Sequence, residues 1–474
     1  MKSIRGTFLA IFVAIAAFSS PVHSQTQNDR GGVVSADEIT LENISGAYAD
    51  GVTLREQGRL APSETLFRQL VVAGERLFGA DDPNMADILN QLALSLEAQR
   101  KLGEAEEAVQ RALDIGQASV GDDHPSFAVF LNTMGLIQEA QGRYEDAVQV
   151  YGQSLRILEA TVGVEHTVYA TVLNNLAETL RGLGRYADAE ALLRKALETR
   201  ESAGSEGDPE GFYLLNNLGL ALERQGKYLE AEQVFRQVLD GAKTVMGPDN
   251  PDYALLVNNL ALTLENQGKY EEAAGLYQAA SDIMRTALGE AHPTYAMSLG
   301  NTGNVLIHLG RYNEAIPVLE EAVDIIGASL GEAHPQFARM LNSLAMANLS
   351  AQQFFRARKL LEQSLLLTEA SVGTQHPSYS TALNNLARIA VIQKRFDDAE
   401  DLSRQAVAIS EQMLGPNHPD YAIQLGNLGH ILAMQGKYEE ARRLLLETMR
   451  IFEATVPAGH VYIIETRRRL NELP

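Results

Sequence analysis

The sequence predicts an all-α fold: a superhelical solenoid of about ten antiparallel helix pairs, closed by a C-terminal capping helix. A motif of two asparagines, a leucine and a small residue recurs every 42 residues, beginning at Asn174, Asn216 and Asn258. Glycine and proline recur with the same period between the copies. Apolar residues between these junctions follow the three-and-four spacing of amphipathic helices. A fixed period of this size is the signature of stacked repeat units.

Residues 1–24 have the features of a secretory signal peptide. Lys2 and Arg5 precede the charge-free apolar run 7–18, and the predicted cleavage follows Ser24. This run is too short to span a bilayer, so a retained anchor is the weaker alternative. We therefore expect an exported protein, periplasmic or secreted.

The polar residues 25–40 are predicted to form a flexible lead-in. Ser35 and Glu38 have the spacing of a capping box, so a helix is expected to begin near Ala36. From residue 41 to residue 460, ten repeats of 42 residues follow one another without insertion or deletion.

The junctions define the helix boundaries. Glycine favours the left-handed turn just past a helix, and proline favours the first position of the next helix. The prolines are Pro83, Pro125, Pro209, Pro251, Pro293, Pro335, Pro377 and Pro419. Four residues before most of these stand Gly79, Gly121, Gly247, Gly289, Gly331, Gly373 and Gly415, and Gly163 falls on the same register.

Each repeat contains two predicted helices. Leu173, Leu176 and Leu180 mark the buried stripe of the first helix, and Ala189 and Leu193 mark that of the second. The segment 461–474 is predicted to cap the stack, with Arg467, Arg468 and Arg469 facing solvent. The copies differ in places: Ser63 replaces a usual alanine, and Gln352 and Lys394 replace the glycine of the turn within a repeat.

Composition excludes several classes of function. The net charge of −22 leaves no basic footprint for nucleic acid, and it disfavours association with anionic membranes. The chain has no cysteine, and it has no nucleophile elbow, phosphate-binding loop or zinc-protease motif. We therefore expect no enzyme activity, no cofactor, no metal and no stable membrane insertion.

The residues Leu173, Leu176, Ala177, Leu180, Gly184, Tyr186, Ala189, Leu193 and Ala196 resemble the tetratricopeptide repeat (TPR) pattern. The 42-residue period, the paired asparagines and the Gly-x-x-His-Pro junction resemble the kinesin-light-chain type of this repeat. No heptad segment precedes the repeats, so a motor function is not implied. The resemblance implies a solenoid whose first helices line a concave groove.

That groove is the implied binding site for a protein or peptide. The predicted peptide-binding residues are Asn90, Asn132, Asn174, Asn175, Asn216, Asn217, Asn258, Asn259, Asn342 and Asn384. An asparagine side chain offers two donors and an acceptor, so a row of them can hydrogen-bond an extended backbone. The alternative is that each asparagine only bridges adjacent repeats.

Other rows predict the character of the groove. Leu94, Leu136, Leu220, Leu262 and Met346 form either apolar pockets or core. Glu97, Glu139, Glu223 and Glu265 make the early groove acidic, whereas Ile307, Leu349, Val391 and Ala433 make the late groove apolar, with Arg339 and Arg388 adding positive charge. The expected ligand is an extended or helical segment that is basic where it meets the early repeats.

Seven histidines share one junction position: His124, His166, His292, His334, His376, His418 and His460. Asp82, Asp208 and Asn250 stand at the same position in other copies, and such residue types cap helices. We therefore predict that the histidines cap helices or pack in the loops, in preference to binding zinc.

The function that these observations favour is an exported, non-enzymatic interaction module. The alternative is a structural scaffold or assembly factor in a cell-envelope or secretion complex. Self-association through the Arg-rich end is a third possibility.

Overall fold

The computed structural model describes residues 35–204, 209–455 and 461–474. These residues form twenty-one α-helices and one short 3-10 helix, and no strand occurs among them. The all-α prediction is therefore confirmed. The predicted signal peptide and most of the lead-in lie outside the described residues. Within the described ranges, no helix combines the length and apolarity needed to cross a membrane.

The chain divides into two compact units, residues 1–221 and 222–474. Before the boundary lie η1 (Ala36–Glu38), α1 (Ile44–Glu56), α2 (Leu60–Leu77), α3 (Pro83–Glu97), α4 (Leu102–Ser119), α5 (Pro125–Ala140), α6 (Tyr144–Thr161), α7 (Thr167–Gly182) and α8 (Tyr186–Ser202). Helix α9 (Pro209–Arg224) contains the boundary. The second unit continues with α10 (Tyr228–Met246), α11 (Pro251–Asn266), α12 (Tyr270–Leu288), α13 (Pro293–His308), α14 (Tyr312–Leu330), α15 (Pro335–Ser350), α16 (Phe354–Val372), α17 (Pro377–Ile392), α18 (Phe396–Leu414), α19 (Pro419–Met434), α20 (Tyr438–Thr455) and α21 (Val461–Asn471).

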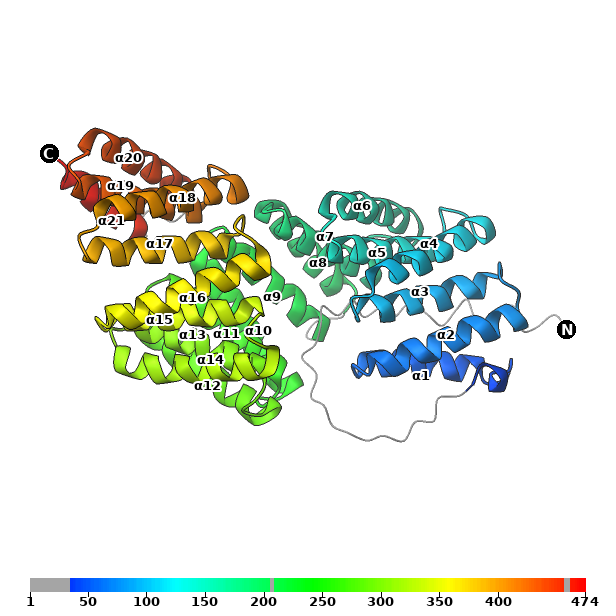
Figure 1. Cartoon of the computed structure of the whole chain (residues 1–474). Helices are drawn as coiled ribbons and strands as arrows, with labels where there is room; N and C mark the ends of the chain where they lie inside the picture. Colours follow the sequence, from blue (N-terminus) through cyan, green and yellow to red (C-terminus); the bar gives the residue numbers. More distant parts are fainter. Residues whose placement is uncertain (1–34, 205–208, 456–460) are drawn as a thin grey trace. The chain divides into compact units, whose positions relative to one another are not determined.

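Within each unit, consecutive helices pack in pairs that stack on one another (Figure 1). Several odd-numbered helices also contact the next odd-numbered helix, as α3 does with α5 and α13 with α15. Consecutive even-numbered helices make no comparable contact in the described parts of either unit. The odd-numbered helices therefore form the more closely spaced layer, which is the inner side of a curved stack. We call it the inner layer.

The junction residues begin the odd-numbered helices as predicted. The first residue of α3, α5, α11, α13, α15 and α19 is a proline. The residue before it caps the helix: His124 Nδ1 accepts from the backbone N–H of Ser126 at 3.2 Å, and His292 Nδ1 accepts from Thr294 at 3.2 Å. The other capping histidines are His166, His334, His376 and His418. The capping prediction is confirmed for these six, and His460 lies outside the described residues.

The turn inside each repeat requires a left-handed backbone at one position. Glycine occupies it in most copies, as at Gly142 with φ 78° and Gly268 with φ 79°. Gln352 and Lys394 hold the same conformation at φ 62° and 60°. Arg100 does so too at φ 60°, which sequence reasoning missed. A side chain with a Cβ is disfavoured in this conformation, so these turns are locally strained.

We expect Gln352→Gly to raise the free energy of unfolding by about 0.5–1 kcal/mol, because glycine removes the clash that a Cβ makes at positive φ. Urea unfolding followed by circular dichroism measures the change. The reverse substitution, Gly268→Gln, is expected to lower stability by a similar amount. An unchanged midpoint in both variants would contradict this account of the turn.

The two helices of a repeat approach closely where a small residue faces a large one. A Cβ added at Gly135 of α5 would lie 2.5 Å from the ring of Tyr151 in α6. A Cβ added at Gly51 would lie 2.8 Å from the ring of Phe67. Tyr151 and Phe67 are fully buried. These small residues are therefore part of the core packing.

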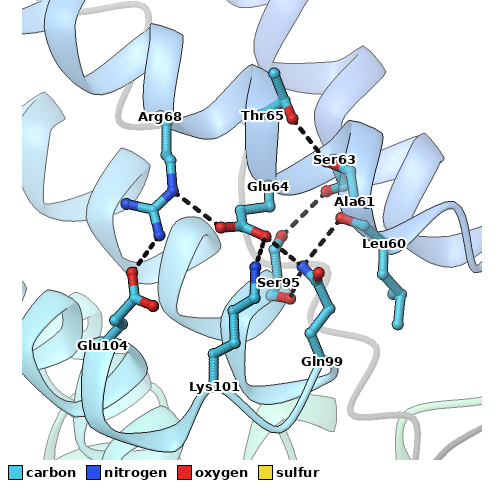
Figure 2. A network of polar contacts seen from close by, with 10 residues as sticks. All are labelled: Leu60, Ala61, Ser63, Glu64, Thr65, Arg68, Ser95, Gln99, Lys101 and Glu104. Atoms are coloured by element: carbon cyan, nitrogen blue, oxygen red, sulfur yellow. Dashed lines mark hydrogen bonds and ion pairs between the residues drawn. The ribbon is translucent and has the colours of Figure 1, made fainter.

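A polar clamp ties neighbouring repeats together (Figure 2). Glu64 of α2 is 8% exposed, and its carboxylate accepts from Arg68 Nε at 2.9 Å, Gln99 Nε2 at 2.9 Å and Lys101 Nζ at 2.6 Å. Burial alone would raise the pKa of Glu64, but the hydrogen bonds from Lys101, Arg68 and Gln99 bring the pKa below its usual value. Arg68 also pairs with Glu104 of the next repeat.

The clamp recurs in both units. Glu106 accepts from Gln141 and Arg143 at 2.8 and 2.6 Å. Glu232 accepts from Gln267 and Lys269, both at 2.8 Å. Despite burial, hydrogen bonds from Lys269, Gln267 and Arg236 lower the pKa of Glu232 to about 2. Each clamp joins the second helix of one repeat to the turn of the next, so it fixes how successive inner-layer helices align.

The first repeat and the lead-in before it each contain a distinctive hydrogen-bond arrangement. Ser63, which replaces a usual alanine, is fully buried and bonds to the Gly51 carbonyl at 2.8 Å and to Ser95 Oγ at 3.0 Å. Glu38 accepts from the Ser35 backbone N–H at 2.9 Å, as a capping box requires. The turn that follows is a 3-10 helix of three residues, and α1 begins only at Ile44.

Candidate binding surface on the inner layer

The predicted asparagine rows lie on the seam between adjacent inner-layer helices. In the first unit, Asn175 Nδ2 donates to Asn132 Oδ1 at 2.9 Å, and Asn217 Nδ2 donates to Asn174 Oδ1 at 2.9 Å. In the second unit, Asn385 pairs with Asn342 at 2.9 Å and Asn427 pairs with Asn384 at 3.3 Å. Each pair joins residues 43 positions apart. We call these contacts the asparagine seam.

The seam residues differ in what they can offer a ligand. Asn90, Asn132 and Asn175 are each 2% exposed, and Asn217, Asn384 and Asn385 are at most 8% exposed. The half-buried members are Asn174, Asn216, Asn258, Asn259 and Asn342. A ligand on this surface would therefore reach the half-buried residues, although two of them, Asn174 and Asn342, also bridge repeats. A peptide-binding role for these asparagines stays a prediction.

The asparagine pairing is interrupted near the start of the second unit. Asn258 Nδ2 donates to the Ala254 carbonyl of its own helix at 3.2 Å, and its buried Oδ1 has no hydrogen-bond partner. Asn301, which stands 43 residues later, is exposed. In that repeat, Gly300 stands where other copies have the first asparagine of the pair. The half-buried Asn258 thus carries an acceptor that the protein leaves unsatisfied.

The C-terminal helix continues the same register. Arg469 Nη1 of α21 donates to the Gly426 carbonyl of α19 at 3.1 Å, again 43 residues apart. Arg467 and Arg468 are exposed, whereas Arg469 is partly buried and also pairs with Glu465 at 3.0 Å. The predicted solvent-facing role is therefore wrong for Arg469, because its guanidinium turns inward to the seam.

Carboxylates stand on the inner layer of the first unit. Burial raises the pKa of Glu97 and of Glu178 above the usual range. Burial also raises the pKa of Glu139 to about 7, although Thr179 donates a hydrogen bond to its carboxylate at 2.7 Å. The Arg181 guanidinium lies 3.7 Å from Glu178. The pKa of Glu178 stays raised even with this cation nearby. A carboxylate that is desolvated and incompletely neutralised favours a cationic ligand.

We expect Glu139→Gln to stabilise the first unit by about 1–2 kcal/mol at pH 8. The folded pKa of about 7 lies above the unfolded value, so the protonated carboxyl favours folding below the unfolded pKa. Wild type loses this stability as the pH rises through 7 and the carboxyl ionises. Glutamine does not ionise, so the variant keeps the stability, and its amide oxygen can still accept from Thr179. The difference from wild type in urea unfolding should shrink between pH 8 and pH 5. A difference that grew as the pH fell would contradict the assignment.

The charge of the side chains on the inner layer of the second unit changes from negative to positive along its length. Glu223 accepts from Asn266 at 2.7 Å, and Glu265 accepts from Tyr277 Oη at 2.8 Å. Burial raises the pKa of both carboxyls. Later in this unit, burial lowers the pKa of Arg339 and Arg388, and the nearby Arg469 lowers that of Arg388 further. A segment lying along this unit would therefore meet carboxylates first and guanidinium groups later.

The apolar row is divided between core and surface. Leu94 is 7% exposed and belongs to the core, whereas Leu262 is 36% exposed. Leu136, Leu220 and Met346 are half-buried. Only the partly exposed members can contact a ligand. The sequence could not separate them, because every one of these residues stands at the same position of its repeat.

Comparisons with solved structures give similar helical repeat chains. A kinesin light chain from Podosopora anserina with nearly identical TPR-like repeats is 26% identical, with 42% of this chain and 95% of that chain covered and a TM-score of 0.35. The apo quorum sensor NprR from B. thuringiensis is 15% identical, with 78% and 99% covered and a TM-score of 0.54. A Rap protein complexed with competence and sporulation factor is 14% identical, with 84% and 99% covered and a TM-score of 0.45. No curated protein matches the chain.

The tetratricopeptide repeat family model matches most of the chain. The matched residues are 51–118, 84–160, 126–202, 211–274, 252–327, 336–412 and 392–454. Stacked repeats of this kind present extended surfaces that serve protein–protein interaction. Helix pairing, the family match and the period of 42 residues agree, so the chain belongs to the tetratricopeptide repeat family.

Proposed function

We propose that this protein is an exported, non-enzymatic interaction module that binds an extended or helical polypeptide segment along its asparagine-lined inner layer. One observation carries the proposal most directly. On the inner layer of the first unit, the half-buried Asn174 stands four residues before the desolvated Glu178, and Thr179 beside Glu178 donates to the desolvated Glu139. Polar groups that are partly removed from water and incompletely satisfied favour a partner that supplies donors and positive charge. The bound segment would therefore be basic where it meets the first unit.

Photo-crosslinking from two positions tests where the partner binds. A benzoylphenylalanine at Leu262 places the probe on the inner layer, and one at Phe355 places it on the outer face of α16, where the side chain is 85% exposed. Crosslinks to a protein partner from Leu262 alone support the proposal. Crosslinks from Phe355 alone would move the binding surface to the outer face.

We expect the combined substitutions Glu139→Lys and Glu223→Lys to weaken partner capture about tenfold or more at low salt, because they reverse the charge at two carboxylates of the inner layer. The matched control is Glu159→Lys with Glu271→Lys, which makes the same change in net charge at two exposed glutamates. Co-purification at low and high salt measures the effect. Equal loss in both pairs would point to net charge, not to this surface.

Export is part of the same proposal. Cleavage after Ser24 would leave a mature chain that begins at Gln25. N-terminal sequencing of the protein recovered from the periplasm or medium tests it. Recovery of a chain that retains Met1 from the cytoplasm would contradict export. It would not affect the proposal that the inner layer binds a polypeptide.

A scaffold in an envelope or secretion complex is the second candidate. Phe355 and Leu366 of α16 are 85% and 66% exposed, and exposed apolar side chains of this size mark contact surfaces when they gather. Self-association would also bury them. Light scattering of the mature chain at low and high salt distinguishes a salt-sensitive ionic contact from an apolar one.

A further inference from the structure

A pocket lies between the first two inner-layer helices of the first unit. Helices α1 and α3 contact each other directly, and the pocket opens at this contact. It holds about 410 Å³ of empty space, part of which is open to solvent. The residues around it are Ile44, Ser45, Tyr48, Phe78, Asn84, Asp87 and Ile88.

The walls of the pocket are apolar and firmly held. Ile44 and Ile88 are 3% and 4% exposed, so their side chains are fixed by the core. Tyr48 is 9% exposed and packs edge-on against Phe67, with ring centroids 5.7 Å apart. These side chains form a preorganised apolar sleeve, which lowers the entropic cost of binding an aliphatic stem.

Asp87 is the charged group in this sleeve. Burial raises the pKa of Asp87 to about 6, and no neighbouring cation or hydrogen bond offsets that effect. Among the described residues, Asp87 forms no ion pair. An uncompensated carboxylate in an apolar wall is unfavourable for folding, so its presence calls for a compensating ligand.

The repeat architecture does not require an acidic residue at this position. The equivalent residues of the later repeats include apolar, aromatic, hydroxyl and basic side chains. They are Val129, Thr171, Tyr213, Leu255, Met297, Arg339, Thr381 and Ile423. Packing between α1 and α3 therefore does not explain the carboxylate, and Asp87 is specific to this pocket.

We propose that the pocket binds a primary ammonium group carried on an aliphatic stem, the chemistry of a lysine side chain. An ammonium has three donors, and the pocket offers Asp87, the Ser45 hydroxyl and Asn84 as acceptors. Asn84 Nδ2 is committed to Asp82 at 2.7 Å, so the atom it can offer is its Oδ1. The stem lies against Ile44 and Ile88, and the rings of Tyr48 and Phe78 favour a cation. This site goes beyond the proposed function and holds whether or not the inner layer binds a polypeptide.

Saturation-transfer NMR on the full mature chain tests the site with butylammonium as the probe. We expect saturation transfer to butylammonium and none to 1-butanol at the same concentration, because the neutral alcohol cannot pair with the carboxylate. Asp87→Asn should weaken butylammonium binding about tenfold or more. Asp122→Asn, which removes one exposed carboxylate in the next junction, should leave binding unchanged.

Controls keep the outcome interpretable. Asp87→Asn is close to isosteric, and a melting temperature at or above that of wild type shows that the variant is folded. Ile88→Trp, which fills the sleeve but keeps the carboxylate, should also abolish binding. Equal binding of butylammonium to wild type and Asp87→Asn, or equal binding of 1-butanol, would overturn the proposal.

A second probe identifies the source of the ammonium. Nα-acetyl-lysine methylamide presents the same ammonium and stem as part of a peptide. Asp87-dependent binding of this probe assigns the site to a lysine side chain of a protein. Asp87-dependent binding of butylammonium alone supports the same chemistry and assigns the site to a free amine.

Discussion

Leu176→Asp is expected to lower the free energy of unfolding of the first unit by about 3–5 kcal/mol. Leu176 lies on α7 and is 8% exposed, so the new carboxylate would be buried among the packed helices. A helix pair of a solenoid cannot bury its apolar faces alone. Damage at α7 therefore removes support from the repeats on both sides, and urea unfolding should show an early loss of helix.

The control for this variant is Val72→Asp in α2. Val72 is 59% exposed, so the same aspartate meets water instead of core. Its effect should stay within about 0.5–1 kcal/mol. Similar midpoints for Leu176→Asp and wild type would show that this side chain is not part of a packed interface.

Gly135→Ala is expected to lower stability by about 1–3 kcal/mol through overpacking. The added methyl would lie 2.5 Å from the ring of Tyr151, which is fully buried and cannot swing away. Three repeats later, the chain has Ala261 and Tyr277 at the equivalent positions. Some relaxation of the helix pair is therefore available, which is why we expect partial and not complete unfolding.

A second glycine of the same repeat provides the matched control. A Cβ at Gly152 in α6 would meet only Arg156 Nη1, at 3.8 Å. Gly152→Ala should raise stability by about 0.5–1 kcal/mol, because alanine is the better helix former. Opposite signs for the two glycine-to-alanine changes are the expected result, and equal signs would contradict the close approach at Gly135.

Most of the fold could be predicted because every junction has its own boundary signals. A proline such as Pro293 begins an inner-layer helix, and a glycine such as Gly289 ends the helix before it, at φ 91°. These are local effects of backbone geometry, so a single sequence contains them. The start of α1 was harder to predict, because Ser35 and Glu38 form a capping box on a 3-10 turn and not on the helix itself.

The partners of the asparagines could not be predicted in the same way. Asn174 and Asn217 belong to different rows of the sequence, and the structure joins them across one repeat plus one residue. That offset depends on how two repeats rotate and slide against each other, which side-chain packing decides. The useful signal was the chemical match between the rows: a donor at one position and an acceptor at the other, 43 residues apart.

The polar clamp had a signal that sequence reasoning missed. Gln141 and Arg143 flank the turn glycine, and Glu106 stands near the start of the second helix of the preceding repeat. All three positions recur with the period of the repeat. Asp87 gave no such signal, since its carboxylate occurs in only one copy. A search for periodic residues finds features that several repeats share, but it does not find a residue that serves only one repeat.

Arg469 has a consequence for assembly. By donating to the Gly426 carbonyl, it occupies the site where the first inner helix of another copy would have to dock to lengthen the stack. Helix α21 therefore takes this place in the stack itself. Another helix could stack on the same surface of α19 only after α21 detached.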